Sequence, residues 1–422
     1  MARSSKLLVT TIIFLLLMPI VTSCARSTPE PAPSPIPGSA PIPMPTPNST
    51  PASPSTLTPA EPTPTPPEEI ELDLVETVPS SYQLDVTPIY AGHDVCMLGS
   101  LGMIAKYVDP SLDFCDIVGC SGIGPTGYFM PDKPTGLKFT FVNGHWAGMV
   151  FAPRHLGFSL ILGIADGGKI DESPSPDEQA RIEHRQPDTA HLALKDIVKR
   201  IEYFDNVDDA FNFLKKVIAS GYPVEVHLNV IPVMHDFAKV SDNWVDHCKR
   251  LERDDTGSHF MVVAGYDSEY VYLNDPTDPG KPANLPATIC NFKSAWDVPK
   301  GTAPNNTGPY WMLFIKNIRG KESADSILAW SKERAKDTPR ETCLLSEDPL
   351  VASEISSDKT RIHVISEMRL EYSKFLAKNG KGGAAALYEQ SGKLWVGLLE
   401  SSSISDDLKK IADLEERAQQ LY

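Results

Sequence analysis

The stretch Ser258-His-Phe-Met-Val-Val-Ala-Gly-Tyr-Asp-Ser-Glu-Tyr-Val-Tyr-Leu-Asn-Asp-Pro276 decides how this chain is interpreted. Two apolar runs flank the polar segment that begins at Asp267, and this pattern predicts a β-hairpin. If the hairpin folds about Asp267, His259 lies directly opposite Asp275. Directly opposed residues share a face, with Cβ atoms about 5 Å apart, so the carboxylate would orient the imidazole and stabilise its charge.

A candidate nucleophile lies far upstream, in Asp94-Val-Cys96-Met-Leu-Gly-Ser100. Apolar residues recur at helical spacing after Cys96, which predicts a helix that begins near this cysteine. The exposed N–H groups and the dipole of a helix N-terminus stabilise a thiolate, and a nearby imidazolium stabilises it further. Cys96, His259 and Asp275 therefore form a candidate set of nucleophile, base and orienting group.

These motifs resemble those of a known family. Cys-x-x-x-Ser-Leu-x-Met from Cys96, Gly-x-Pro-Val at 221–224 and the His259 to Pro276 block are similar to papain-like cysteine peptidases of the bacteriocin-processing type. The similarity is greater to the branch represented by butirosin biosynthesis protein H, an acyltransferase-like relative. It runs from about residue 90 to 296, and a weaker similarity continues into the C-terminal region.

The resemblance implies an α+β, papain-like fold in which an N-terminal nucleophile helix packs on an antiparallel sheet. We assign this domain to residues 69–319 and expect an α-helical C-terminal domain over residues 320–422. Apolar stripes such as Ile365, Met368, Tyr372 and Phe375 recur there at helical spacing, and we expect them to be packing surfaces.

One position departs from the family pattern. Bacteriocin-processing peptidases carry a glutamine six residues before the nucleophile, where its amide helps form the oxyanion hole, and this chain has Tyr90. Loss of one oxyanion donor typically costs about 2.7–4 kcal/mol of transition-state stabilisation. Tyr90, His93 or a backbone N–H is a candidate substitute.

The N-terminus predicts export. Basic residues, an apolar stretch and Val-Thr-Ser-Cys24 describe a secretory signal over residues 1–23. The last four residues resemble a bacterial lipobox, which implies acylation of Cys24 and attachment to the membrane through lipid. An uncleaved N-terminal helix anchor is the alternative. Both interpretations place the rest of the chain outside the cytoplasm.

Residues 24–68 predict a disordered stalk, because 16 of the 38 prolines lie between Pro29 and Pro67. Such a composition cannot bury a core and favours an extended chain. The net charge of the whole chain is −16, which argues against nucleic acid as a partner.

Seven cysteines are present, and removing a lipidated Cys24 leaves six. An even number in an oxidising compartment raises the possibility of disulfides, and Cys115 and Cys120 are candidates for a small disulfide loop. Pairing of all six would exclude Cys96 as a nucleophile. No set of residues has the spacing of a metal site, and we expect neither metal nor cofactor.

Residues 206–220 predict a helix, and residues 223–230 predict a strand with His227 on a face that meets solvent or the rim of the site. The loop from Pro232 to Gly257, which includes Trp244, is either a flap over the site or a solvated insertion. The glycine cluster around Pro125 would let the backbone pack beside the nucleophile helix.

Two classes of function remain open. A thiol enzyme would pass its acyl group to water, as a peptidase or amidase does, or to an amine, as an acyltransferase does. A surface binding protein would keep the fold and lack turnover, as the tyrosine at position 90 suggests.

Overall fold

The computed structural model describes residues 70–92, 95–126, 129–132, 136–139, 145–166, 197–246, 257–278, 283–297, 309–318, 320–347 and 359–422. Residues Thr65–Tyr422 form one compact unit, which includes both the predicted papain-like domain and the predicted helical domain. The predicted signal and stalk, Cys24 and His93 lie outside the described residues. In the described part of the chain, no helix combines the length and apolarity needed to cross a membrane.

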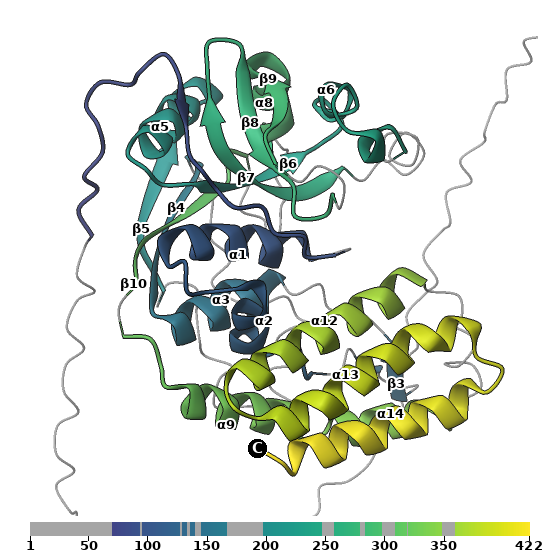
Figure 1. Cartoon of the computed structure of the whole chain (residues 1–422). Coiled ribbons are helices and arrows are strands. Elements are labelled where there is room, and N and C mark those ends of the chain that lie inside the picture. The colour runs from purple at the N-terminus through teal and green to yellow at the C-terminus, as the bar shows by residue number, and fades with distance from the viewer. Residues whose placement is uncertain are drawn as a thin grey trace, which may run out of the picture. The chain divides into compact units, whose positions relative to one another are not determined.

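The centre of the fold is an eight-stranded sheet (Figure 1). Its strands follow the order β5-β4-β10-β6-β7-β8-β9, and β1 pairs with β7. All pairs are antiparallel except β4 with β5. The strands are β1 (Tyr82–Gln83), β4 (Phe158–Ala165), β5 (Val198–Phe204), β6 (Val224–Asn229), β7 (Ser258–Tyr266), β8 (Tyr270–Asn274), β9 (Leu285–Thr288) and β10 (Met312–Ile318).

Helices cover both faces of this sheet. Helix α1 (Cys96–Val108) packs against β6, β7 and β10. Figure 1 shows α5 (Val207–Ala219) and α8 (Ile289–Trp296) on the other side of the sheet. The predicted helix over 206–220 is confirmed as α5, and the Asn206 side chain caps it by accepting hydrogen bonds from the N–H groups of Asp208 and Asp209.

Because helices cover both faces of the sheet, strand β6 is buried on both of its faces. Val224, Val226 and Leu228 share one face, as the alternation predicts. His227 lies on the opposite face and is only 1% exposed, so its predicted place at solvent or at the site rim is wrong. The His227 Nε2 atom lies 2.7 Å from the Ser258 hydroxyl, and its ring packs 4.8 Å from that of Phe260.

The predicted hairpin forms from β7 and β8, but its register differs from the predicted one. Val262 pairs with Asn274 and Val263 with Leu273, so the ladder is shifted by two residues from a fold about Asp267. A shift of two leaves the side chains in this part of the ladder on their original face, because the side-chain period of a strand is two. The register changes once more between Val263 and Gly265, nearer the turn. His259 and Asp275 consequently meet diagonally instead of directly across the ladder.

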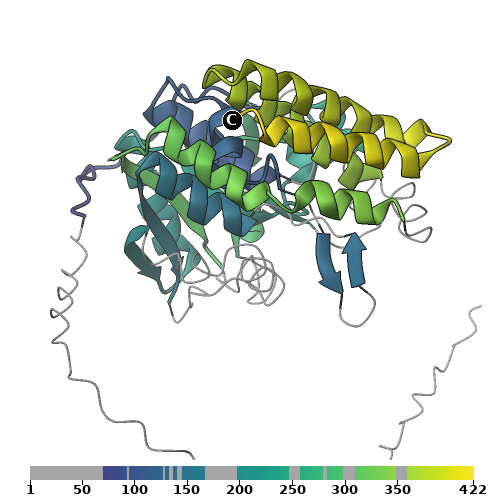
Figure 2. The same ribbon diagram turned by 90° about the horizontal axis from the view of Figure 1, so that it is seen from below.

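The C-terminal region is helical, as predicted. Its elements are α9 (Ala324–Ala335), α10 (Thr338–Leu345), α12 (Lys359–Lys378), α13 (Gly382–Gly397), the 3₁₀ helix η4 (Leu398–Glu400) and α14 (Ile404–Gln419). Ile365, Met368, Tyr372 and Phe375 are buried, which confirms that this stripe is a packing surface. In Figure 2 these helices run beside one another, while the ribbon formed by β2 (Phe129–Asp132) and β3 (Gly136–Phe139) stands apart from the main sheet.

Helix α2 (Phe114–Ser121) joins the helical region to the first half of the chain, together with α3 (His145–Leu156). A side chain at Gly119 would overlap the Phe375 ring, with its Cβ 2.4 Å from the ring atoms, and one at Gly124 would meet Tyr372 at 2.6 Å. These glycines therefore allow α12 to approach closely. The prediction that they serve packing against the nucleophile helix is wrong.

The predicted Cys115–Cys120 disulfide does not form, and both cysteines are buried and unpaired. They lie on the same helix α2, where residues five apart are separated by about 140° around the axis. Burial raises the pKa of the Cys115 thiol to about 12, with Asp116 as a smaller cause, and it also raises that of Cys120. Both side chains are therefore core groups.

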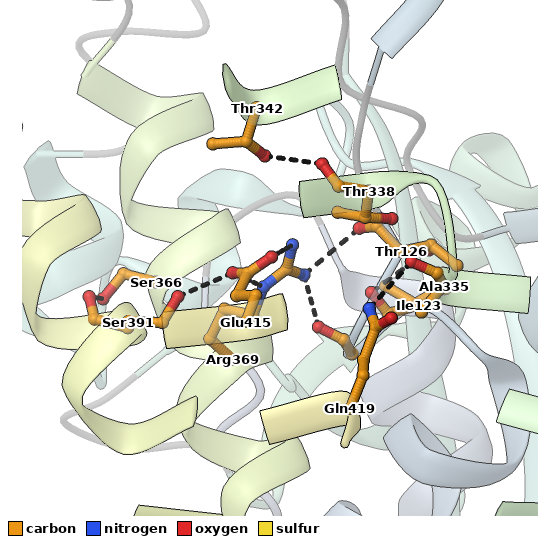
Figure 3. Close-up of polar contacts among 12 residues, drawn as sticks. Ile123, Thr126, Ala335, Thr338, Thr342, Ser366, Arg369, Ser391, Glu415 and Gln419 are labelled. Carbon is orange, nitrogen blue, oxygen red and sulfur yellow. Dashed lines mark hydrogen bonds and ion pairs between the residues drawn. The ribbon is translucent and has the colours of Figure 1, made fainter. Parts of the chain in front are cut away.

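A buried ion pair fixes the helical region to the loop after α2 (Figure 3). The Arg369 guanidinium donates hydrogen bonds to both carboxylate oxygens of Glu415, at 2.6 and 3.3 Å. It also donates to the carbonyls of Gly124 and Thr126, and the Ser391 hydroxyl donates to Glu415 at 2.6 Å. Both charged side chains are 0% exposed. The pair ties α12 and α14 to the chain that leads from α2.

Candidate active site

Cys96 is the first residue of α1, as the sequence predicts. The preceding residue, Val95, makes no side-chain capping bond, so the thiol sits beside backbone N–H groups at the helix N-terminus. Cys96 is 8% exposed, and the following residues of the helix are buried against the sheet. The helix thus presents the sulfur at the edge of the core.

A close backbone approach holds the start of α1 next to the end of the hairpin. A Cβ at Gly99 would lie 2.5 Å from the Pro276 side chain and 2.6 Å from that of Ala91, so only glycine fits there. The Ala91 N–H also donates to the Pro276 carbonyl at 2.7 Å. These contacts bring the start of α1 beside the residue that follows Asp275, although 179 positions separate Cys96 from Asp275 in the chain.

The structure brings His259 and Asp275 into contact. The imidazole Nε2 lies 2.9 Å from the Asp275 Oδ1 atom, and the two side chains are 12% and 2% exposed. Thr277 supports the same oxygen, because its N–H and its hydroxyl each donate to Oδ1 at 2.8 Å. Asp275 is thereby held in one orientation by three donors.

Cys96 interacts with the same imidazole. Burial alone would lower the pKa of His259, but the Asp275 and Cys96 charges, together with hydrogen bonds to both residues, raise it to about 10. Because Nε2 is engaged by Asp275, Nδ1 is the ring nitrogen left for the thiol. At neutral pH this arrangement favours an imidazolium at His259.

The electrostatics of Asp275 complement those of His259. Burial would raise the pKa of this carboxyl, but the His259 charge, its hydrogen bond and the donors of Thr277 lower it overall. Asp275 is therefore an anion over the whole physiological range. Sequence reasoning did not find Thr277, although a hydroxyl two residues after an aspartate is a common local donor.

Part of the predicted loop over 232–257 frames the site. Trp244 is 2% exposed, and its ring lies 6.4 Å from the His259 ring and 4.9 Å from Phe237. The Ser241 hydroxyl and the Asn243 amide donate to Asp278 at 2.6 and 2.7 Å. Residues 241–244 are thus fixed beside the imidazole, which favours the flap over the solvated insertion for this part of the loop.

Tyr90 lines a pocket that is separate from the candidate catalytic residues. It is 43% exposed and lines a pocket of about 580 Å³ that it forms with Ala91, Gly92, Phe114 and residues of α12 and α13. Neither Cys96 nor His259 lines this pocket. Burial and the Glu367 charge raise the pKa of the Tyr90 hydroxyl, so it stays neutral. His93, the other oxyanion candidate, lies outside the described residues.

Cys96 is unpaired in the structure, as a nucleophile requires, and so is the exposed Cys290. Cys248 lies outside the described residues. Within the described ranges, no group of three or more His, Cys, Asp or Glu side chains is arranged to hold a metal ion.

Comparison with known proteins finds a similarity over part of the chain. Residues 183–304 match the model of the Peptidase C39 like family. This segment contains His259 and Asp275. It begins well after Cys96 and so does not include that residue. No curated protein matches the chain.

Among solved structures, a C39-like peptidase from Bacillus anthracis is similar, with 13% identity and a TM-score of 0.29. The match covers 57% of this chain and 99% of that one. The architecture is α+β, with a helix that begins at a cysteine packed on a mostly antiparallel sheet and a helical C-terminal region. Over residues 183–304 the chain is similar to C39-like members of the papain-like cysteine peptidase superfamily.

Proposed function

We propose that this protein is a thiol hydrolase that cleaves a peptide or amide bond through an acyl-enzyme on Cys96. The observation that carries the proposal is the charged cluster at the start of α1. His259 bonds to Asp275 at 2.9 Å, and its interaction with Cys96 raises its pKa. The C39-like match over residues 183–304 supports the same reaction class.

In the proposed reaction, the Cys96 thiolate attacks the carbonyl carbon of the scissile bond. The His259 imidazolium then gives its proton to the leaving nitrogen, and the carbon–nitrogen bond breaks. Water enters, His259 takes a proton from it, and the hydroxide attacks the thioester. The acid leaves and the thiolate is regenerated, while Asp275 holds the imidazole orientation throughout.

The developing oxyanion needs a donor, and the backbone N–H of Cys96 at the helix N-terminus is a candidate among the described residues. The glutamine position is Tyr90, which lines the pocket toward α12 and α13. This difference favours a second candidate, transfer of the acyl group to an amine, as the resemblance to the butirosin branch implies. A catalytically silent binding protein with the same fold is the third.

A peptide digestion separates these candidates. The purified protein is incubated at neutral pH with a diverse synthetic peptide mixture, with and without an added small amine, and new termini are identified by mass spectrometry. A hydrolase produces free carboxyl termini, and Cys96→Ser abolishes them. The matched variant Cys290→Ser removes an exposed cysteine on α8 and leaves cleavage unchanged.

Products that carry the added amine as an amide, in place of free carboxyl termini, would show that the protein transfers the acyl group to an amine. Cleavage that survives Cys96→Ser, or the absence of any product from the wild-type protein, would contradict the thiol hydrolase.

We also propose that the protein is anchored outside the cytoplasm by lipid on Cys24. The support is the apolar stretch followed by Val-Thr-Ser-Cys24 and by the proline-rich segment. Metabolic labelling with a fatty acid in a bacterial host tests it. Label should enter the wild-type protein and not Cys24→Ser, and equal labelling of both would contradict the anchor.

A further inference from the structure

A pocket of about 580 Å³ lies between the helical region and the segment that precedes α1. Residues 90–92 form one part of its wall, and most of the rest comes from α12 and α13, which pack along each other (Figure 1). Pockets of roughly 300–1,000 Å³ are the size at which proteins bind small ligands. The proposed reaction takes place outside this pocket, because neither Cys96 nor His259 lines it.

Much of the pocket wall is apolar or aromatic. Tyr90 and Phe114 contribute rings, and Ala91, Leu370 and Ala385 contribute aliphatic surface. The Tyr90 side chain is 43% exposed, so its ring is accessible to a ligand. Aliphatic surface favours burial of an alkyl chain, and the face of a tyrosine ring attracts a cation.

The charges in the wall favour a cationic ligand. Three carboxylates, those of Glu367, Glu371 and Glu389, line the pocket against one ammonium group, that of Lys374. The Lys374 side chain is 63% exposed, whereas that of Glu371 is only 20% exposed and Glu367 is half-buried. Because water screens an exposed charge more than a partly buried one, the two inner carboxylates determine the potential inside the pocket.

The wall that carries Glu367 is shared with the start of the catalytic region. A Cβ at Gly92 would lie 1.8 Å from Glu367 Oε2 and 3.0 Å from Oε1, so the carboxylate occupies the space that a side chain at position 92 would fill. The next residue, Ala91, donates its N–H to the Pro276 carbonyl at 2.7 Å and lies close to Gly99 of α1. A ligand in the pocket therefore contacts the same short segment that contacts the hairpin end and α1.

We propose that this pocket binds the side chain of a lysine in a peptide, with its alkyl chain on the apolar wall and its ammonium group at Glu367 and Glu371. A neutral side chain would cover the two carboxylates without pairing them, and an acidic side chain would be repelled. That this peptide is the substrate rests on the proposed function, whereas the binding itself does not require turnover.

Isothermal titration calorimetry of the full chain carrying Cys96→Ser tests the binding, because this variant leaves the peptide uncleaved. The probes are acetyl-Gly-Lys-Gly-amide and the matched peptides with norleucine or glutamate in place of lysine. Norleucine keeps the alkyl chain and lacks the ammonium group, so its peptide should bind at least about tenfold more weakly than the lysine peptide. The glutamate peptide should bind more weakly still.

Substitutions in the wall locate the bound ammonium group. Adding Glu367→Gln or Glu371→Gln to the Cys96→Ser protein should each weaken binding of the lysine peptide about five- to tenfold, and leave binding of the norleucine peptide within about twofold. Glu416→Gln removes an exposed carboxylate on α14 that does not line the pocket, and it should leave both affinities unchanged. Circular dichroism confirms that the compared proteins are folded.

Three binding results would overturn the inference: no measurable binding of the lysine peptide, equal affinity for the lysine and norleucine peptides, or lysine binding that both Glu367→Gln and Glu371→Gln leave unchanged. Cleavage by the protein with its native Cys96 tests the substrate assignment separately. There, lysine-containing peptides should have a higher kcat/KM than their norleucine counterparts, and Glu367→Gln should remove this preference. Binding without such a preference would contradict the substrate assignment, and binding without any cleavage would contradict the proposed function.

Discussion

Two buried ion pairs in this protein use the same chemistry for different ends. Arg369 and Glu415 are both fully buried, and their hydrogen bonds are shared among α12, α14, Ser391 and two loop carbonyls. His259 is 12% exposed, and one side of its ring is engaged by Asp275 while the other is left for a thiol. An ion pair whose hydrogen-bonding groups are all used within the fold can only stabilise the structure. An ion pair that contacts a thiol can also take part in a reaction.

The largest effect that tests this contrast is on stability. Arg369→Met leaves the Glu415 carboxylate buried without its cation, which should lower the free energy of unfolding by about 3–5 kcal/mol. The measurement is urea unfolding. Arg417→Met, which removes an exposed pair with Asp413 on the same α14, should change it by less than about 0.5 kcal/mol. Equal losses of unfolding free energy in the two variants would mean that the buried pair does not stabilise the helical region.

A substitution in the His259–Asp275 pair should affect the reactivity of Cys96 more than the stability of the protein. Asp275→Asn removes the charge that raises the pKa of His259, so less imidazolium is present to stabilise the thiolate. Alkylation of Cys96 at pH 7 should slow at least about tenfold, but less than in His259→Ala, because Asp275 orients and does not accept the proton.

Asp278→Asn is the matched variant for this prediction. Asp278 is also a buried aspartate in the same segment, but its oxygens accept from Ser241 and Asn243. Its substitution should slow alkylation several-fold less than Asp275→Asn does. A greater loss from Asp278→Asn would show that the ordered loop, and not the charge on Asp275, controls the thiol.

The pH dependence of stability gives a third comparison. The pKa of His259 is raised from 6.5 to about 10, so its stabilising contribution is complete below about pH 6.5 and is lost as the pH rises through about 10. The difference in unfolding free energy between the wild type and His259→Gln should therefore shrink between pH 6.5 and pH 10. The matched substitution of His235, which is exposed, should change the unfolding free energy only slightly. A constant difference for His259 would contradict the charged pair.

The smallest expected effect concerns the support of Asp275. Thr277→Val removes the hydroxyl that donates to Oδ1 and leaves the backbone N–H in place. Loss of one such bond, about 1 kcal/mol, should slow Cys96 alkylation about fivefold. Thr342→Val removes a comparable buried hydroxyl in α10 and should leave the rate unchanged. No loss in Thr277→Val would show that the backbone donor suffices.

Local patterns predict the elements of this protein well. The alternation of apolar residues predicts β6 and the two strands of the hairpin, and helical periodicity predicts α5 and the stripe of α12. The segments that carry Cys96, His259 and Asp275 were recognisable because each pattern is local. The register of the hairpin was wrong by two residues, and the contact between His259 and Asp275 survived because a shift of two keeps the same face.

Features that depend on what covers an element were not predictable in the same way. His227 was expected at solvent because an alternating strand usually has one wet face, but helices cover both faces of β6. The same coverage buries Glu225, whose burial the alternation of the strand did not predict. The prediction of a Cys115–Cys120 disulfide was wrong because the segment between the two cysteines is helical, which their spacing alone did not show.

We propose that the fold activates Cys96 through His259, and competitive alkylation tests this activation most directly. The folded protein is treated with a limiting amount of iodoacetamide at pH 7, and modified cysteines are quantified by peptide mapping. Cys290 is exposed, whereas Cys96 is nearly buried, so accessibility alone favours Cys290. We expect Cys96 to react first in the wild type and Cys290 to react first in His259→Ala. Preferential labelling of Cys290 in both proteins would contradict an activated thiol.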